Sequence, residues 1–346
     1  MSYSDREENN FNLIRMIAAY LVILAHATAI QGRGTDIVVR ITGQTHSGQM
    51  AVFIFTFLSG IFITKSILHS DSWTFLKNRF IRIYPELILC LVVILIIGGV
   101  FTTRSQFDYW TNAQTWKYFF ANLLEISNEH FLPGVWEGHP NQGMNGVLWY
   151  ITFEVRVYLV WILIKTLGLF DEKEKANIVL SILLVWVIAR PETMPLLGSE
   201  SSLYGLVDFP QYTITFILGA LFYLNIKEVS LTRGHLFFII IVMVIFRHSS
   251  VATWVWATGF IVIALLVGTN ERILSIKVKD LSYGIFLYGW PTGQLVYEVM
   301  PNASAFMAAI VTALCATAFA MVSERVVYMV KNYIFKFRKK ELSEVR

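Results

Sequence analysis

The chain has 346 residues and a formal net charge of +4; 55% of its residues are hydrophobic, 15% are aromatic and only 15% are charged. Its mean hydropathy is +0.57. A soluble domain of this length does not need so much apolar surface, so the composition indicates a polytopic membrane protein embedded in a lipid bilayer. The small net charge gives no reason to expect a nucleic-acid partner.

Ten apolar runs follow one another along the chain. We interpret them as about ten transmembrane helices of an all-α protein with a single membrane domain, residues 1–346. A helix needs about 20 apolar residues to cross a bilayer. The runs cover residues 11–30, 50–68, 83–101, 147–169, 177–190, 212–225, 235–247, 251–268, 281–298 and 303–324. The longest break, residues 102–146, is rich in aromatic residues and is expected to be partly amphipathic around 109–126.

The basic residues are distributed unevenly between the two sides of this arrangement. With the N-terminus in the cytoplasm, 20 of the 28 Lys and Arg residues fall inside, six fall outside, and Arg15 and Arg156 lie within spans. Cytoplasmic loops of membrane proteins carry an excess of Lys and Arg. We therefore predict that both termini are cytoplasmic and that the loop 102–146 is external.

The first run carries two polar side chains, Arg15 and His26. Both are costly to place in lipid, so they are expected to face a protein interior or a wet cavity. They are about three helical turns apart, so they share one helical face at a separation of about 16 Å. Alternatively, Arg15 extends to the headgroups and His26 is a hydrogen-bonded packing residue. The acidic leader before this run argues against its cleavage as a signal peptide.

Two more arginines, Arg79 and Arg82, stand at the predicted cytoplasmic mouth of the third span. They are three residues apart and therefore lie on one helical face, and Pro85 is expected near the start of that helix. They are interpreted in one of two ways. They are positive charges that fix the orientation of the protein in the membrane, or they bind phosphate groups, which guanidinium groups contact bidentately.

The fourth span carries Glu154 about two turns from its outer end, where the carboxylate can approach His26 in depth. Carboxylates within membrane spans are rare and mark functional sites. Arg156, two residues later, points elsewhere on the helix and is assigned no role. The two cysteines, Cys90 and Cys315, lie in apolar runs and are interpreted as core residues. The chain contains no CxxC, HExxH or P-loop motif, and we expect no metal.

Five segments, in this order along the chain, resemble motifs of the type-3 membrane acyltransferase family, the bacterial surface-polysaccharide O-acetylases. They are Arg15 with His26, FTFLSGIFI at residues 55–63, KNRFIRIYP at 77–85, NGVLWYITFE at 145–154 with Tyr158 following, and SYGIFLYGWP at 282–291. Gly289 stands where the last motif often has a histidine, so no catalytic role is transferred to that position.

This resemblance implies transfer of an acyl group, expected to be acetyl from cytoplasmic acetyl-CoA, across the bacterial inner membrane. The acceptor it implies is a hydroxyl of a cell-surface polysaccharide or of its lipid-linked precursor. On this basis we expect catalytic roles for His26, Glu154 and Arg15, donor binding by Arg79, Arg82 and Ser59, and acceptor binding by Asn145, Trp149 and Tyr283.

Two roles are open for His26: it deprotonates the acceptor hydroxyl as a general base, or it carries the acyl group itself. The general-base role is preferred, with Glu154 as the carboxylate that fixes the tautomer of the ring. Aromatic residues of the external loop either stack on sugars or form an interfacial belt; they include Trp110, Trp116 and Trp136, with His130 and His139 nearby.

Two other functions remain open. A transporter or flippase of lipid-linked sugars would also need polar groups within spans, but it is expected to show related halves. No such repeat is visible, because the candidate functional residues crowd into the first four spans. An acyltransferase acting on a lipid or other small acceptor would use the same chemistry, and the sequence does not separate that possibility from a polysaccharide acceptor.

Overall fold

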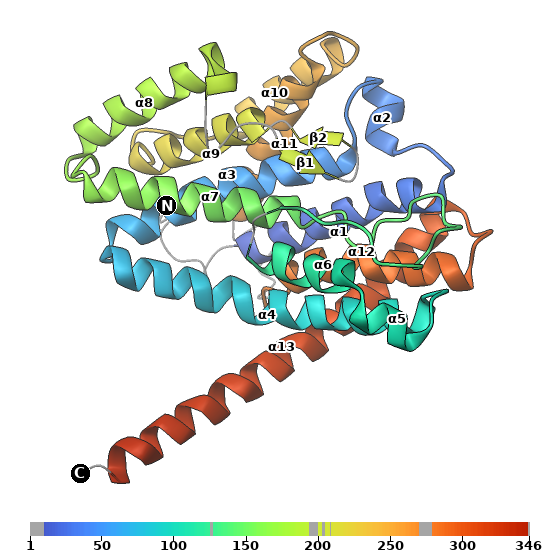
Figure 1. Cartoon of the computed structure of the whole chain (residues 1–346). Coiled ribbons are helices and arrows are strands. Elements are labelled where there is room, and N and C mark those ends of the chain that lie inside the picture. The colour runs from blue at the N-terminus through green and yellow to red at the C-terminus, as the bar shows by residue number, and fades with distance from the viewer. Residues whose placement is uncertain are drawn as a thin grey trace.

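The computed structural model describes residues 10–124, 127–193, 200–202, 205–207, 209–269 and 279–344. This part of the chain is helical apart from one short antiparallel hairpin, β1 (Glu200–Ser202) and β2 (Gly205–Val207) (Figure 1). The predicted helical fold class is therefore confirmed, and the hairpin is an addition to it. The α-helices are α1 (Phe11–Gln31), α2 (Ile37–Thr42), α3 (Ser47–Leu68), α4 (Ser72–Phe101), α5 (Gln106–Thr111), α6 (Ala113–Leu123), α7 (Trp149–Thr166), α8 (Lys173–Ala189), α9 (Phe209–Leu224), α10 (Arg233–Ile245), α11 (Ala252–Thr269), α12 (Ser282–Val299) and α13 (Ala305–Glu344).

Each of the ten predicted apolar runs coincides with one of these helices. Among the described residues, five helices are long and apolar enough to cross a membrane: α1, α3, α4, α11 and the first 29 residues of α13. Helices α9 and α10 are apolar but shorter. The protein is therefore a multi-pass membrane protein, whereas the number of ten spans and the orientation of the termini stay predictions.

Two helix boundaries differ from the sequence prediction by more than a few residues. Helix α4 begins at Ser72 rather than at residue 83, because Asp71 caps it by accepting a 2.9 Å hydrogen bond from the backbone N–H of Thr74. Pro85 consequently lies inside this helix and not near its start, and Arg79 and Arg82 are helical residues. Helix α13 continues from Ala305 to Glu344, about 20 residues beyond the predicted end of the last span.

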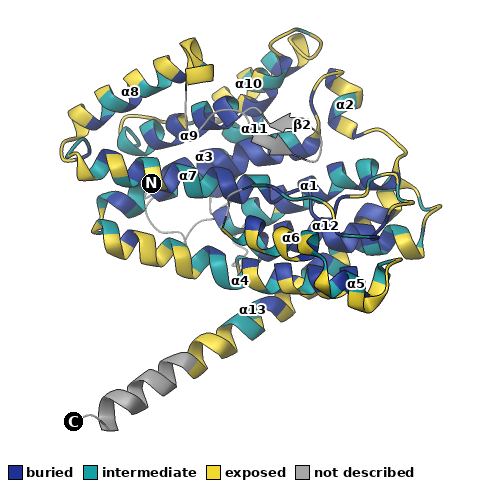
Figure 2. Ribbon diagram, in the orientation of Figure 1, coloured by how far each residue is buried: buried dark blue, intermediate teal, exposed yellow. Residues whose placement is uncertain are grey.

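The centre of the bundle is formed by α1, α3 and α12, which are mostly buried (Figure 2). Helix α3 packs most extensively against α9, and α12 packs against both α13 and α1. Between α3 and α9 the backbones meet at two glycines. A Cβ on Gly60 would lie 2.2 Å from the carbonyl oxygen of Phe216, and a Cβ on Gly219 would lie 2.2 Å from that of Phe57. No larger residue fits at either position without separating the helices.

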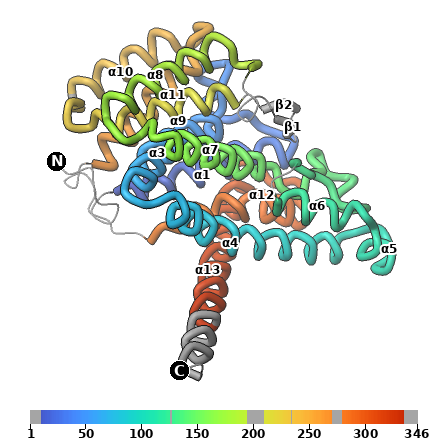
Figure 3. The backbone as a smooth tube through the Cα atoms, turned by 60° about the vertical axis from the view of Figure 1, so that its left-hand side comes forward, coloured from blue at the N-terminus to red at the C-terminus, as the bar shows by residue number. Residues whose placement is uncertain are grey.

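The outer helices expose apolar side chains. On α8 and α10 these include Ile178, Ile182, Phe237, Phe238 and Ile245. Apolar surface of this kind is compatible with hydrocarbon and not with water, which agrees with a bundle surrounded by lipid. Helix α13 leaves the bundle and projects away from it in both views (Figures 1 and 3).

Candidate active site

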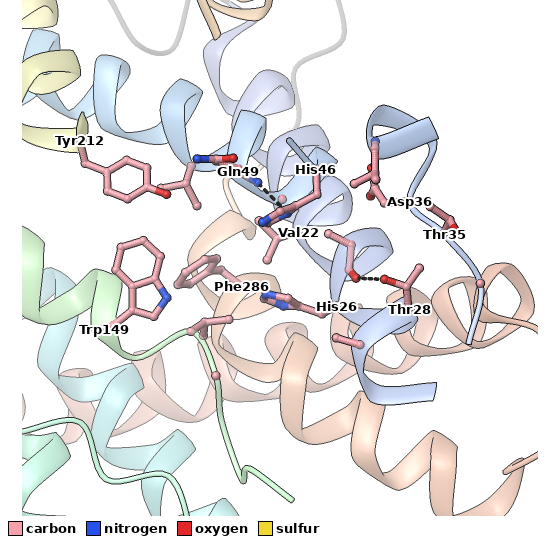
Figure 4. A pocket seen from close by; sticks show the side chains of 18 of the residues that line it. Val22, His26, Thr28, Thr35, Asp36, His46, Gln49, Trp149, Tyr212 and Phe286 are labelled. Carbon is pink, nitrogen blue, oxygen red and sulfur yellow. Dashed lines mark hydrogen bonds between the residues drawn. The ribbon is translucent and has the colours of Figure 1, made fainter. Parts of the chain in front are cut away.

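A cavity of about 590 Å³ lies at the end of the bundle where α1 carries His26 (Figure 4). Its wall is built from α1, the segment that leads into α2 and α2 itself, the start of α3, the residues that lead into α7 and its first residue, the start of α9 and the first half of α12. The polar and aromatic side chains in this wall include Asp36, His46, Gln49, Trp149, Gln211 and Tyr212. Such a mixture of aromatic surface and convergent polar groups is typical of a small-molecule site.

His26 lies edge-on against Trp290, with ring centroids 4.7 Å apart and planes at 69°. Trp290 is fixed in turn, because its Nε1 donates a 2.8 Å hydrogen bond to the carbonyl oxygen of Gly143. Within the described residues, no group forms a hydrogen bond with the imidazole of His26. The ring is therefore held by packing, and its nitrogen atoms are left for a ligand or water.

Two glycines make this arrangement possible. A Cβ on Gly289 would lie 2.8 Å from Cγ1 of Ile23 on α1, so α12 can approach the helix of His26 only because this residue has no side chain. A Cβ on Gly146 would lie 2.7 Å from the ring of Trp290. Gly289 therefore has a packing role at the point where the related motif often has a histidine.

The wall of the cavity that contains α7 and α9 is aromatic. The rings of Trp149 and Tyr212 lie 5.3 Å apart at an angle of 35°. Next to them, Gln49 donates a hydrogen bond of 3.3 Å from Nε2 to Oε1 of Gln211. This wall offers a flat apolar surface with amide groups at its edge, which suits a ligand that has both an apolar face and polar groups.

Three arginines gather near the opposite end of α1. Arg82 lies within electrostatic range of both Arg15 and Arg79, and Arg15 forms an ion pair of 3.7 Å with Asp280. Among the described residues, the Nε atoms of Arg15 and Arg79 are buried without a hydrogen-bond partner. Buried N–H groups without acceptors are costly, and guanidinium groups match phosphate well. The cluster therefore fits an anionic ligand.

Glu154 is held between the arginine cluster and the cavity. Its Oε1 accepts a hydrogen bond of 2.8 Å from Ser59 and one of 3.4 Å from Tyr150, and its Oε2 accepts one of 3.0 Å from Tyr158. Among the described residues, the expected pairing of Glu154 with His26 is not present, and the carboxylate accepts its hydrogen bonds from hydroxyl groups of α3 and α7. Glu154 lines a small cavity together with Arg15 instead.

A second, smaller cavity of about 20 Å³ lies beside Arg15 and Glu154. Phe286 of α12 lines both this cavity and the larger one at His26. Its ring packs against Phe55 and Tyr150, with centroids 5.9 and 5.7 Å away. Phe286 is therefore a shared wall between the arginine end and the histidine end of the site.

The predicted acceptor-binding residues are separated in the structure. Trp149 lines the large cavity, as expected for such a role. Asn145 does not line it: its amide donates a 3.0 Å hydrogen bond to the carbonyl oxygen of Leu287 and accepts one of 3.2 Å from the N–H of Val147. Tyr283 lines the small cavity with Arg15. Asn145 thus fixes the loop before α7, and Tyr283 lies at the arginine end.

The aromatic residues of the 102–146 segment do not line the large cavity. Trp136 has a positive φ of 55° and stacks on His139, with centroids 5.5 Å apart. His139 is fixed by contacts of 2.9 Å to Gln294 and 2.7 Å to Glu298. These side chains anchor the segment to α12. They do not line the cavity and are therefore not placed to stack on a ligand inside it.

Several residues of the site were not singled out from the sequence: Asp36, His46, Gln49, Gln211, Tyr212, Asp280 and Trp290. Most of them lie in loops or at helix ends, where no periodic pattern distinguishes them. In the described part of the chain, no group of three or more His, Cys, Asp or Glu residues is arranged to hold a metal ion.

The protein is a membrane-embedded helical bundle. It has a cavity lined by His26 at one end and a cluster of arginines at the other. Residues 8–325 match the family model described as an acyltransferase domain. The chain therefore belongs to this acyltransferase family, which confirms the resemblance seen in its motifs.

Two relatives extend this finding. An O-acetyl transferase of Shigella phage Sf6 is 24% identical over 313 residues, which cover 85% of this chain and 87% of the relative. Nodulation protein 10 of Rhizobium leguminosarum bv. viciae is 26% identical over 321 residues, 83% of each chain. No solved structure matches the chain.

Proposed function

We propose that this protein transfers an acetyl group from cytoplasmic acetyl-CoA to a sugar hydroxyl of a cell-surface polysaccharide or its lipid-linked precursor. The observation that carries this proposal is the arrangement of two adjacent cavities along one helix. One helix, α1, bears Arg15 in the basic cluster and His26 in the large cavity, and Phe286 borders both. The family membership and the O-acetyl transferase activity named for the phage relative support the acetyl group.

The arginine cluster is the proposed donor site. Phosphate groups of CoA would supply acceptors for the buried, unpartnered Nε atoms of Arg15 and Arg79. To bring the thioester to His26, about 16 Å away along α1, the pantetheine arm would have to pass Phe286, which separates the two cavities. In this proposal, the arginine end faces the cytoplasm of a bacterial inner membrane and the His26 cavity faces outward, with both termini cytoplasmic.

His26 is the proposed general base. It takes the proton from the acceptor hydroxyl as the oxygen attacks the thioester carbonyl; the C–S bond then breaks and CoA leaves as its thiol after protonation. A neutral imidazole within reach of the hydroxyl is needed for this step, and the position of His26 in the wall of the large cavity supports this role. Glu154 has a different proposed role: it stiffens the donor end through Ser59 and Tyr158.

The acceptor is proposed to lie in the large cavity against Trp149 and Tyr212. Comparing the surface glycans of cells with and without this chain by mass spectrometry tests the proposal. We expect a mass increment of one acetyl group on a sugar in the presence of the wild-type chain, and its loss with His26→Ala. Identical glycans in both strains would refute a polysaccharide acceptor.

A further inference from the structure

A second histidine, His46, faces the same cavity as His26. It lines the cavity wall and is the N-cap residue of α3. Its Nδ1 accepts a 3.2 Å hydrogen bond from the backbone N–H of Gln49. Because Nδ1 must be unprotonated to accept this bond, a neutral His46 carries its proton on Nε2. The ring therefore offers an N–H donor to a ligand in the cavity.

The position of His46 is fixed by its neighbours in the chain. The carboxylate of Asp36 accepts a 3.0 Å hydrogen bond from the N–H of Ser47 and a 2.5 Å bond from its hydroxyl. At Gly48 the helix touches α1, since a Cβ there would lie 2.9 Å from the Cβ of Ala25, the residue before His26. The two histidines thus stand on adjacent helices at a point of backbone approach, within electrostatic range of each other.

The surroundings of His46 favour its neutral form. Protonation of Nδ1 would break the helix cap, and a cation at a helix N-terminus is opposed by the helix dipole. Burial of the ring lowers the pKa of His46 by more than the nearby carboxylate of Asp36 raises it. Asp36 also accepts a hydrogen bond of 2.8 Å from the N–H of Val38. The titratable group that faces His46 from α1 is His26.

We propose that His46 is an acceptor-positioning residue: it donates its Nε2–H to an oxygen of the acceptor sugar, which lies against Trp149 and Tyr212, and so directs one hydroxyl toward His26. This inference rests on the proposed function of the cavity. It assigns His46 no proton transfer and no contact with CoA. Its removal is therefore expected to weaken acceptor binding and to leave the donor site unchanged.

Two substitutions separate the donor role of His46 from its capping role. His46→Asn keeps a side-chain oxygen at the position of Nδ1, which can cap α3, but loses the N–H at the position of Nε2. His46→Gln keeps an N–H donor near the position of Nε2 and loses the cap. His69→Asn, at the exposed C-terminal end of the same helix, is the matched control.

The assay uses the full-length protein in lipid nanodiscs, radiolabelled acetyl-CoA and surface polysaccharide isolated from cells that lack this chain. For His46→Asn we expect the KM for polysaccharide to rise at least tenfold, with an unchanged melting temperature and an unchanged KM for acetyl-CoA. His46→Gln should retain a near wild-type KM for polysaccharide but melt at a lower temperature, and His69→Asn should match wild type.

Two outcomes would overturn the inference. One is a KM for polysaccharide within twofold of wild type in His46→Asn. The other is equal loss of activity in His46→Gln and His46→Asn together with loss of an ionisation from the pH profile of kcat, which would make His46 a proton-transfer residue. Failure of the wild-type protein to acetylate the polysaccharide would instead refute the proposed function, so the two failures are distinguishable.

Discussion

The hydroxyl of Tyr158 donates a 3.0 Å hydrogen bond to Oε2 of Glu154, one helical turn earlier on α7. Tyr158 also lies within electrostatic range of Arg79 and Arg82. Through this tyrosine the carboxylate of Glu154 is connected to the arginine cluster and not to the imidazole of His26. The contact therefore places the carboxylate beside the arginine cluster, which is the proposed donor site.

Tyr158→Phe is expected to destabilise the protein, because it removes one of three hydroxyl donors from a carboxylate inside the bundle. A hydrogen bond to a charged group is worth about 1.5–3 kcal/mol. Thermal unfolding in nanodiscs, followed by tryptophan fluorescence, measures the change. Tyr328→Phe, at an exposed position of α13, is the control and should leave the melting temperature unchanged. Equal melting of Tyr158→Phe and wild type would show that the contact contributes nothing to stability.

The double variant Arg79→Gln and Arg82→Gln is expected to bind CoA at least about tenfold more weakly, since each charge-assisted contact contributes about 1.5–3 kcal/mol. Isothermal titration of purified protein with CoA measures the affinity. Lys77→Gln removes a positive charge from an exposed position of the same helix and should bind CoA as wild type does. If the double variant retains wild-type affinity, the arginines are topological anchors only.

His26→Ala is expected to lower the acetylation rate by about a hundred- to ten-thousandfold, which is the usual contribution of general-base catalysis. The rate is measured with radiolabelled acetyl-CoA and isolated polysaccharide, at equal expression and membrane insertion. His26→Gln should be similarly inactive, because an amide cannot take up a proton. His248→Ala, in an exposed turn, serves as the control. Retention of more than a tenth of the wild-type rate in His26→Ala would make the imidazole a packing residue.

The orientation in the membrane is tested by cysteine labelling in intact cells. In a background with Cys90→Ala and Cys315→Ala, Ser105→Cys is expected to react with an impermeant maleimide, because the loop after α4 is predicted to be external. Glu344→Cys at the end of α13 is expected to react only after the cells are opened. The reverse labelling pattern would invert the whole topology, and with it the assignment of donor and acceptor ends.

The sequence was sufficient to predict the helices of the bundle, because long apolar runs can satisfy their backbone hydrogen bonds in lipid only as helices. It did not predict where α4 begins or where α13 ends. The first turns of α4, from Ser72, and the last turns of α13 contain several Lys and Arg residues, so the apolar runs do not include them. Asp71, the N-cap residue of α4, marks the start of this helix in the sequence. A prediction that rests on hydropathy does not use this local signal.

For the site, the motifs identified the side chains but not their partners. Arg79 and Arg82, which were predicted to bind the donor, do lie close together, and Arg15, which was predicted to be catalytic, lies within electrostatic range of Arg82. The partner of Glu154, however, depends on how α3 packs against α7, because Ser59 lies 95 residues away in the sequence. His46 belongs to no motif and precedes its helix. Its relation to His26 exists only because Gly48 lets α3 approach α1.

Phe286 has a consequence for how the two proposed substrates meet. Its ring forms a wall of both cavities, so it lies between the arginine end and the histidine end of the site. In the proposed topology these two ends face opposite membrane surfaces. The position of this one ring therefore decides whether a thioester at one end and a hydroxyl at the other are in contact or kept apart.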